Sequence, residues 1–117
     1  MRYHANMTIN IQEYLGLNGK SPFTEWFSRL DSNTAAKVST ALTRMEMGNL
    51  SNAKSISAGL LEYRIHYGAG IRIYFGKDGD RLIILLGGGT KRRQQKDIEV
   101  AQQRWREYQQ RKKRQKS

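Results

Sequence analysis

The stretch YRIHYGAGIRIYF (Tyr63–Phe75) reads as two short strands joined by a turn that contains glycine. In both runs apolar residues alternate with other residues, which is the pattern of strands that bury one face. Ile65 and Ile73 belong to the apolar faces. Arg64 and Arg72 belong to the opposite faces, because side chains alternate along a strand. The sequence therefore predicts a hairpin with one apolar face and one face that carries arginines.

The loop of this hairpin decides which residues lie opposite each other. A three-residue loop, Gly68-Ala69-Gly70, keeps the apolar residues of both strands on one face, whereas a two-residue loop would set arginine against isoleucine. We therefore expect His66 opposite Arg72, and we expect Arg72 to be an exposed strand residue. With Arg64 opposite Tyr74, four side chains would form one patch: Arg64, His66, Arg72 and Tyr74.

Length and composition limit the class of protein. At 117 residues the chain suffices for one domain with a small core, and we expect residues 1–117 to form a single domain. The absence of cysteine excludes disulfides and thiolate metal sites. The segment MRYHANMTINIQ shows no signal-peptide pattern, and the longest apolar run, LIILL, has five residues. We therefore expect a cytoplasmic protein that does not insert into a membrane.

Charge is the most informative part of the composition. Twenty-one Lys and Arg against ten Asp and Glu give a net charge of +11 and a pI near 10.3, which favours a polyanionic partner, most often nucleic acid. Most of the excess lies in residues 91–117, where eleven basic and three acidic residues give +8. The last part of it, residues 109–117, is a basic tail that either is solvated or has a specific role.

Helical patterns flank the hairpin. Ser21-Pro22 fits a helix start, and apolar residues then recur at helical spacing as far as Leu30. DSNT, residues 31–34, begins a second helix that we expect to stop at Gly48-Asn49. After GGGTKRRQQ, a third helix carries an apolar stripe that either folds onto the sheet or meets a partner. The stripe consists of Ile98, Ala101, Trp105 and Tyr108.

Two further segments complete the expected sheet. Ile9 and Ile11 alternate in a first strand, and Asp78-Gly79 predicts a two-residue turn that pairs Ile73 with Ile84. This pairing would place Ile83 and Leu85 on the arginine side. The expected order is strand, two helices, a three-strand antiparallel meander and a C-terminal helix, which is an α+β fold.

The candidate chemistry is that of a phosphate site. The chain has two histidines, His4 and His66, scattered carboxylates and no G-x-S-x-G motif, so we expect no metal, no cofactor and no serine triad. Three glycines followed by three cations, Lys91, Arg92 and Arg93, would let the backbone approach a phosphate and the side chains bind it.

RNA cleavage by the neighbouring 2′-hydroxyl needs stabilisation of the phosphate charge and two proton transfers. Arginine and lysine suit the first task, and Tyr74 or His66 could take part in the second. We expect Arg64, opposite Tyr74, to lower the pKa of the tyrosine hydroxyl.

The segment LLEYRIHYGAGIRIYFGKDGDRLIILLGGGTKRRQQKDIEVAQQRW, residues 60–105, resembles the RelE/ParE superfamily of toxins from type II toxin–antitoxin systems. Within it the chain is similar to the addiction-module killer proteins related to RelE and HigB, over roughly residues 9–105. The resemblance implies a microbial RNase-type fold and a ribosome-dependent endoribonuclease, an mRNA interferase that inhibits translation. It also implies a cognate antitoxin as partner, expected to be a helix-turn-helix DNA-binding protein, and messenger RNA and the ribosome as targets.

The same resemblance assigns residues to roles. It places a RelE-like arginine on Arg72 and a second basic residue on Lys91, with Arg64 beside them. RelE also has a catalytic tyrosine in its C-terminal segment. Here that segment reads RRQQKDIEV, so Tyr74, His66 or Lys96 would have to replace it. The expected RNA contacts are Arg92, Arg93 and Lys96. Two other functions stay open, a ParE-like inhibitor of DNA gyrase and a non-catalytic nucleic-acid-binding module.

Overall fold

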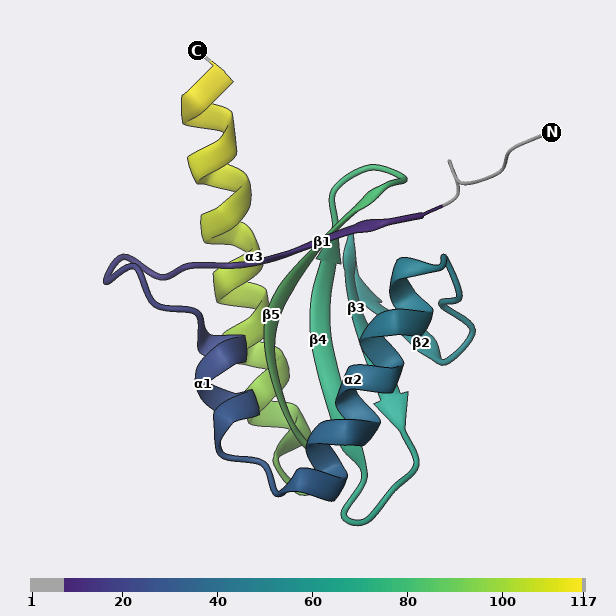
Figure 1. Ribbon diagram of the computed structural model, residues 1–117. Coiled ribbons are helices and arrows are strands. Elements are labelled where there is room, and N and C mark those ends of the chain that lie inside the picture. The colour runs from purple at the N-terminus through teal and green to yellow at the C-terminus, as the bar shows by residue number, and fades with distance from the viewer. Residues whose placement is uncertain (1–7, 117) are drawn as a thin grey trace, which may run out of the picture.

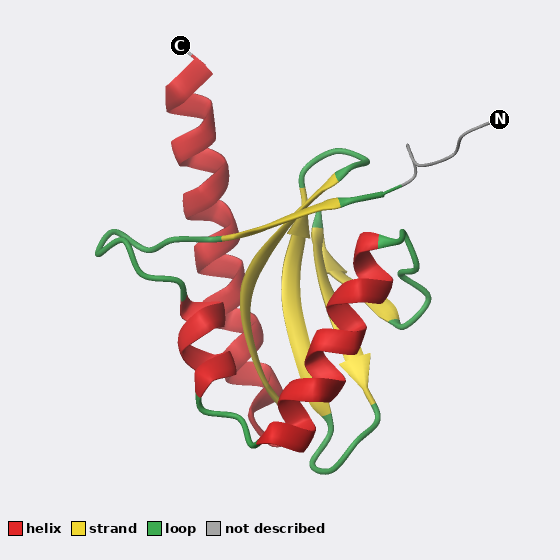
Figure 2. Ribbon diagram, viewed as in Figure 1, coloured by secondary structure: helices red, strands yellow, loops and turns green. Residues whose placement is uncertain are grey.

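A mixed β-sheet with helices on both faces organises the protein (Figures 1 and 2). The computed structural model describes residues 8–116. In this part the strands are β1 (Asn10–Glu13), β2 (Ala53–Ser57), β3 (Leu60–Ile65), β4 (Ile71–Lys77) and β5 (Leu82–Thr90). The helices are α1 (Pro22–Ser28), α2 (Ser32–Glu46), the 3-10 turn η2 (Lys91–Arg93) and α3 (Gln94–Lys116).

The sheet has the order β1-β5-β4-β3-β2, with β1 parallel to β5 and the other pairs antiparallel. The expected α+β fold is confirmed, with the predicted meander as its centre. Strand β2 was not predicted. Its short sequence, AKSIS, carries one isoleucine and is mostly exposed at the edge of the sheet, so it shows little of the alternation that identifies a strand.

Helices α1 and α2 begin where their capping residues predict. The Ser21 hydroxyl accepts a hydrogen bond from the Thr24 amide at 3.0 Å, and the Asp31 carboxylate accepts one from the Thr34 amide at 2.8 Å. These bonds satisfy amides that have no partner inside the helix. Helix α2 ends just before Gly48, whose φ of +85° suits glycine and stops the helix as predicted.

The two faces of the sheet bury different side chains. In Figure 1, α2 lies in front of the sheet and α3 behind it. The front layer joins α1 and α2 to the apolar face of the hairpin, and its buried members include Phe23, Val38, Met45, Ile73 and Phe75. The rear layer joins α3 to the other face, and its buried members include Leu60, Tyr74, Leu86, Ala101 and Trp105. The apolar stripe of the C-terminal helix therefore folds onto the sheet.

Trp105 fixes α3 to the sheet. Its ring lies where a side chain on Gly76 would stand, since an added Cβ there would come within 2.2 Å of the ring. The indole nitrogen donates a hydrogen bond to the Ala58 carbonyl at 3.2 Å. Tyr108 stacks on Trp105 with ring centroids 5.4 Å apart. No helix within residues 8–116 has the length and apolar character of a membrane span.

The register of β3 and β4 differs from the prediction by two residues. Arg64 pairs with Arg72 and Glu62 pairs with Tyr74, so the expected pairs His66–Arg72 and Arg64–Tyr74 are wrong. The loop covers residues 66–70 and is closed by a hydrogen bond from the Gly70 amide to the Tyr67 carbonyl. Because a shift of two residues preserves the side-chain alternation, the two faces are as predicted.

The faces of β5 are the reverse of the prediction. Gly76 pairs with Ile84, and the turn is closed by a hydrogen bond from the Asp78 amide to the Leu82 carbonyl at 2.9 Å. This turn is longer than the two-residue Asp78-Gly79 turn that we expected. Ile83 and Leu85 therefore lie in the front layer, and Ile84 and Leu86 lie under α3. A bulge opposite Tyr74, between Leu85 and Gly87, then shifts the register.

We predict that Gly76→Ala lowers the free energy of unfolding by about 1–3 kcal/mol, because the new methyl group must displace the Trp105 ring. Urea unfolding measures the change. Gly16→Ala is the control, since its Cβ would meet the Asn18 side-chain oxygen at 3.2 Å and the Lys20 carbonyl at an ordinary 3.7 Å, and it should change stability by no more than about 0.5 kcal/mol. Equal losses in both variants would contradict the tight contact between α3 and β4.

Candidate functional site

A buried carboxylate lies at the centre of the arginine face. Glu62 of β3 is 2% exposed and takes three partners from three elements. Arg64 donates from Nε to Oε2 at 2.8 Å, and Gln94 at the start of α3 donates from Nε2 to Oε1 at 2.8 Å. Nη1 of Arg72 lies 3.5 Å from Oε2. One side chain thus joins β3, β4 and α3, and we call these four residues the Glu62 cluster.

Arg72 is not the exposed strand residue that we expected. It is 7% exposed, and its Nε is buried without a hydrogen-bond partner within residues 8–116. The reason is that α3 covers this face of the sheet, with Gln94 bound to the carboxylate that Arg72 approaches. Arg64 is more accessible, with 29% of its side chain exposed. The cluster therefore presents one open and one covered guanidinium.

The cations after β5 lie beside this cluster. The Lys91 amide donates to the Gly70 carbonyl at 2.8 Å, which ties η2 to the β3–β4 loop. Two residues before Lys91, Gly89 pairs with Arg72. The side chains of Lys91, Arg92, Arg93 and Lys96 are all exposed. The structure thus brings Arg64, Arg72 and Lys91 to neighbouring positions at one end of the sheet, around the first turn of α3.

Tyr74 and His66 do not join the cluster as predicted. Tyr74 is 1% exposed, and its hydroxyl is buried without a partner in the described residues. Burial raises the pKa of Tyr74 well above its usual value, and the charges of Glu62 and Asp97 raise it further against the smaller effect of the arginines. The expected lowering of this pKa is wrong. His66 is exposed in the β3–β4 loop and lines a depression next to Lys37 of α2.

Two acidic residues of this region, Glu62 and Asp97, were not among the predicted site residues. Glu62 has a signal in the sequence, because it stands two residues before Arg64 and so shares its face of the strand. Asp97 has none, since only packing brings its carboxylate over Gly89, where an added Cβ would lie 2.1 Å from Oδ2. Burial raises the pKa of Asp97, against the attraction of Arg93 and Arg104.

A further arginine, Arg104, joins α3 to β5 beside the Glu62 cluster. Arg104 of α3 donates from Nη1 to the Leu86 carbonyl at 2.8 Å, and burial lowers its pKa. It lines a cavity of about 260 Å³ between α1 and α3, together with Trp26, Arg93 and Asp97. Among residues 8–116 no three His, Cys, Asp or Glu side chains gather as metal ligands, and His4 lies outside this range.

The chain is similar to a known protein family and to a bacterial protein. The model of the family described as "Phage derived protein Gp49-like (DUF891)" matches residues 25–106. This span includes both arginines of the Glu62 cluster and most of the helices. A protein of Haemophilus influenzae described as an uncharacterized protein is 38% identical over 96 residues, which cover 81% of this chain and 91% of that protein.

We predict that Glu62→Ala lowers the free energy of unfolding by about 3–5 kcal/mol, because it leaves the buried Arg72 guanidinium without its counter-charge. The double variant Glu62→Met/Arg72→Met should recover much of this loss, since it buries no unpaired charge. Urea unfolding of both variants measures the difference. Glu99→Ala, at an exposed position of α3, is the control with a change below about 0.5 kcal/mol. Equal stability of the single and double variants would refute the pairing.

Proposed function

The chain belongs to the Gp49-like family of phage-derived proteins, a family of RelE/HigB-like toxins, and from this premise we propose that it is the toxin of a toxin–antitoxin module. Its proposed activity is ribosome-dependent cleavage of messenger RNA, which stops translation. A cognate antitoxin neutralises it. The observation that carries the proposal is the arrangement of Arg64 and Arg72 around the Glu62 carboxylate, with Lys91 at the neighbouring strand end.

This arrangement suits the charge that develops during RNA cleavage. Attack by the 2′-hydroxyl puts additional negative charge on the phosphate, and donors held in advance stabilise that charge without reorganising. Glu62 binds Arg64 through Nε, so the terminal nitrogens of this half-buried guanidinium stay available to a phosphate. Lys91 adds a cation from the adjoining strand end. We therefore assign phosphate binding to these residues.

Because α3 covers Arg72, phosphate binding by this residue requires a conformational change. Its guanidinium reaches a phosphate only after the first turn of α3 moves, which breaks the bond between Gln94 and Glu62. The first turn of α3 contacts the sheet through the polar bond of Gln94, whereas Trp105, in the middle of the helix, packs into the apolar rear layer. Local opening therefore costs less at Gln94 than at Trp105, because little apolar surface is exposed there.

Proton transfer requires a group that can both accept and donate. We assign this role to His66, because an imidazole can both accept and donate a proton and the loop that carries it is tied to Lys91. Its side chain lines a depression beside α2, so the β3–β4 loop must move to bring it to the phosphate. Tyr74 is unsuited as a base, since its raised pKa keeps the hydroxyl protonated. Lys96, exposed on α3, is the alternative donor to the leaving oxygen.

Inducible expression of the chain without an antitoxin tests the function. We expect growth arrest, loss of translation and cuts in translated messages, whereas a gyrase inhibitor would induce a DNA-damage response and leave messages intact. Harmless expression would favour a binding module instead. Arg72→Lys keeps the charge beside Glu62 but loses the planar guanidinium, so it should reduce cleavage by about 100-fold or more while the protein stays folded.

Matched variants separate the roles of the other residues. His66→Ala should abolish cleavage, and Lys91→Ala should weaken it less, because Arg92 and Arg93 are adjacent. Lys54→Ala, an exposed position on β2 away from the cluster, should remain fully toxic. Full toxicity of Arg72→Lys and His66→Ala together with an intact fold would exclude the proposed site.

A further inference from the structure

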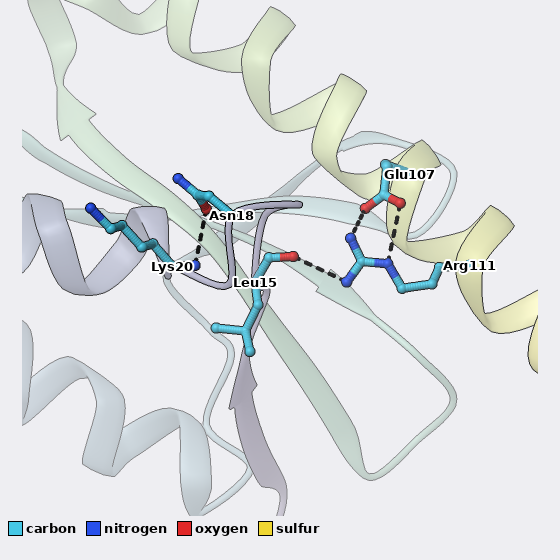
Figure 3. A network of polar contacts seen from close by, with 5 residues as sticks. All are labelled: Leu15, Asn18, Lys20, Glu107 and Arg111. Atoms are coloured by element: carbon cyan, nitrogen blue, oxygen red, sulfur yellow. Dashed lines mark hydrogen bonds and ion pairs between the residues drawn. The ribbon is translucent and has the colours of Figure 1, made fainter.

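The C-terminal part of α3 extends beyond the sheet and is held from two sides (Figure 1). On one side Arg111 donates from Nη1 to the Leu15 carbonyl at 3.1 Å and binds Glu107 through two nitrogens (Figure 3). Its guanidinium also lies 5.6 Å from the centre of the Tyr14 ring. The loop that carries Leu15 is itself closed by a bond from the Lys20 amide to Asn18.

On the other side, the turn between β4 and β5 binds the same helix. The Tyr108 hydroxyl donates to Oδ2 of Asp78 at 2.7 Å, and Lys112 forms an ion pair with the same oxygen. These bonds hold the pKa of the Asp78 carboxyl below its usual range. The extension is therefore an ordered helix with fixed side-chain positions, and Glu107 and Asp78 are both engaged by cations.

A groove of about 530 Å³ lies between this part of α3 and the β4–β5 turn. Five cations line it, and Asp78 is its one acidic residue. Lys112 is paired with Asp78. Within residues 8–116 the side chains of the other four form no hydrogen bond or ion pair, although Lys116 also attracts the Asp78 carboxylate, and the four are Lys77, Arg106, Lys113 and Lys116. The groove thus combines five positive charges with one negative charge, and its excess is positive.

The groove suits a phosphate backbone better than a protein partner or single-stranded bases. Protein interfaces depend on buried apolar anchors, and the exposed large apolar residues of the described chain are Leu15, Leu17 and Met47, which do not line this groove. Single-stranded binding depends on aromatic faces that are free to stack bases. Trp105 is only 5% exposed, and Tyr108, the other aromatic residue of the groove, is half-buried, stacked on Trp105 and hydrogen-bonded to Asp78. Cations without stacking platforms contact double-stranded nucleic acid through its phosphates.

The groove is also separate from the Glu62 cluster. Arg106 lies twelve residues after Gln94 on α3, roughly 18 Å along the helix at 1.5 Å per residue. One phosphate cannot contact both places. We propose that the groove binds the backbone of double-stranded RNA without reading its sequence, and so docks the toxin on folded RNA while the Glu62 cluster handles the single strand. This proposal rests on the proposed function for its RNA target.

Binding of the full-length chain to a synthetic RNA duplex of about 20 base pairs tests the groove, because that length offers two successive minor grooves. The affinity is measured over a series of KCl concentrations. In Arg106→Gln/Lys113→Gln/Lys116→Gln, we expect the affinity to fall about tenfold or more and the slope of log K against log[salt] to decrease by roughly 2 to 3. The control Lys20→Gln/Arg44→Gln/Lys54→Gln removes the same charge from exposed positions elsewhere and should change both far less.

Each outcome decides the proposal. Equal loss in the groove and control variants would overturn it, because net charge alone would then explain binding. Equal affinity of the wild type for a single strand of the same sequence would overturn the assignment to duplex RNA. Loss of affinity for the antitoxin with duplex binding intact would show a protein-docking surface instead. Duplex binding involves no cleavage, so a chain that binds duplex through the groove but cuts no messenger would contradict the proposed function alone.

Discussion

The buried Glu62 carboxylate is the interaction on which the arrangement of the cationic face depends. Two arginines on adjacent strands repel each other, and their pairing across β3 and β4 is stable because the Glu62 carboxylate accepts a hydrogen bond from Arg64 and forms an ion pair with Arg72. The same carboxylate binds Gln94 and so fixes where α3 starts. A single acidic residue therefore sets the position of Arg64, the burial of Arg72 and the entry of the helix that covers them.

Helix α3 packs against two chemically different regions on one face of the sheet. Near Trp105 the sheet offers glycine and apolar side chains, so the helix approaches closely and excludes water. Near Gln94 the sheet offers Glu62, Arg72 and the Tyr74 hydroxyl, which has no hydrogen-bond partner among residues 8–116. Unsatisfied buried polar groups cost stability, and the cost falls when that turn opens to water or ligand. The helix is thus most firmly held where it is apolar and least firmly held over the proposed site.

The sequence predicts the parts of this structure that local patterns determine. Ser21 and Asp31 cap their helices, Gly48 ends one, and the alternation around Ile73 separates the two faces of the hairpin. Register depends on the hydrogen bonds of the turns, and composition does not distinguish the five-residue loop after Ile65 from a three-residue loop. The bulge beyond Leu85 and the burial of Arg72 depend on contacts with α3, so no local pattern contains them.

The acidic residues explain how a chain with a net charge of +11 keeps two distinct cationic regions. Glu62 neutralises Arg64 and Arg72, and Asp97 attracts Arg93 and Arg104. Glu107 and Asp78 bind Arg111 and Lys112, the cations that hold the helix extension in place. Carboxylates thus pair with the cations that are buried and with the cations that hold the C-terminal extension of α3 in place. Among the cations of the described residues that no carboxylate binds, two groups are clustered, one around Lys91 and one along the groove at Arg106, and these are the surfaces that suit a polyanion.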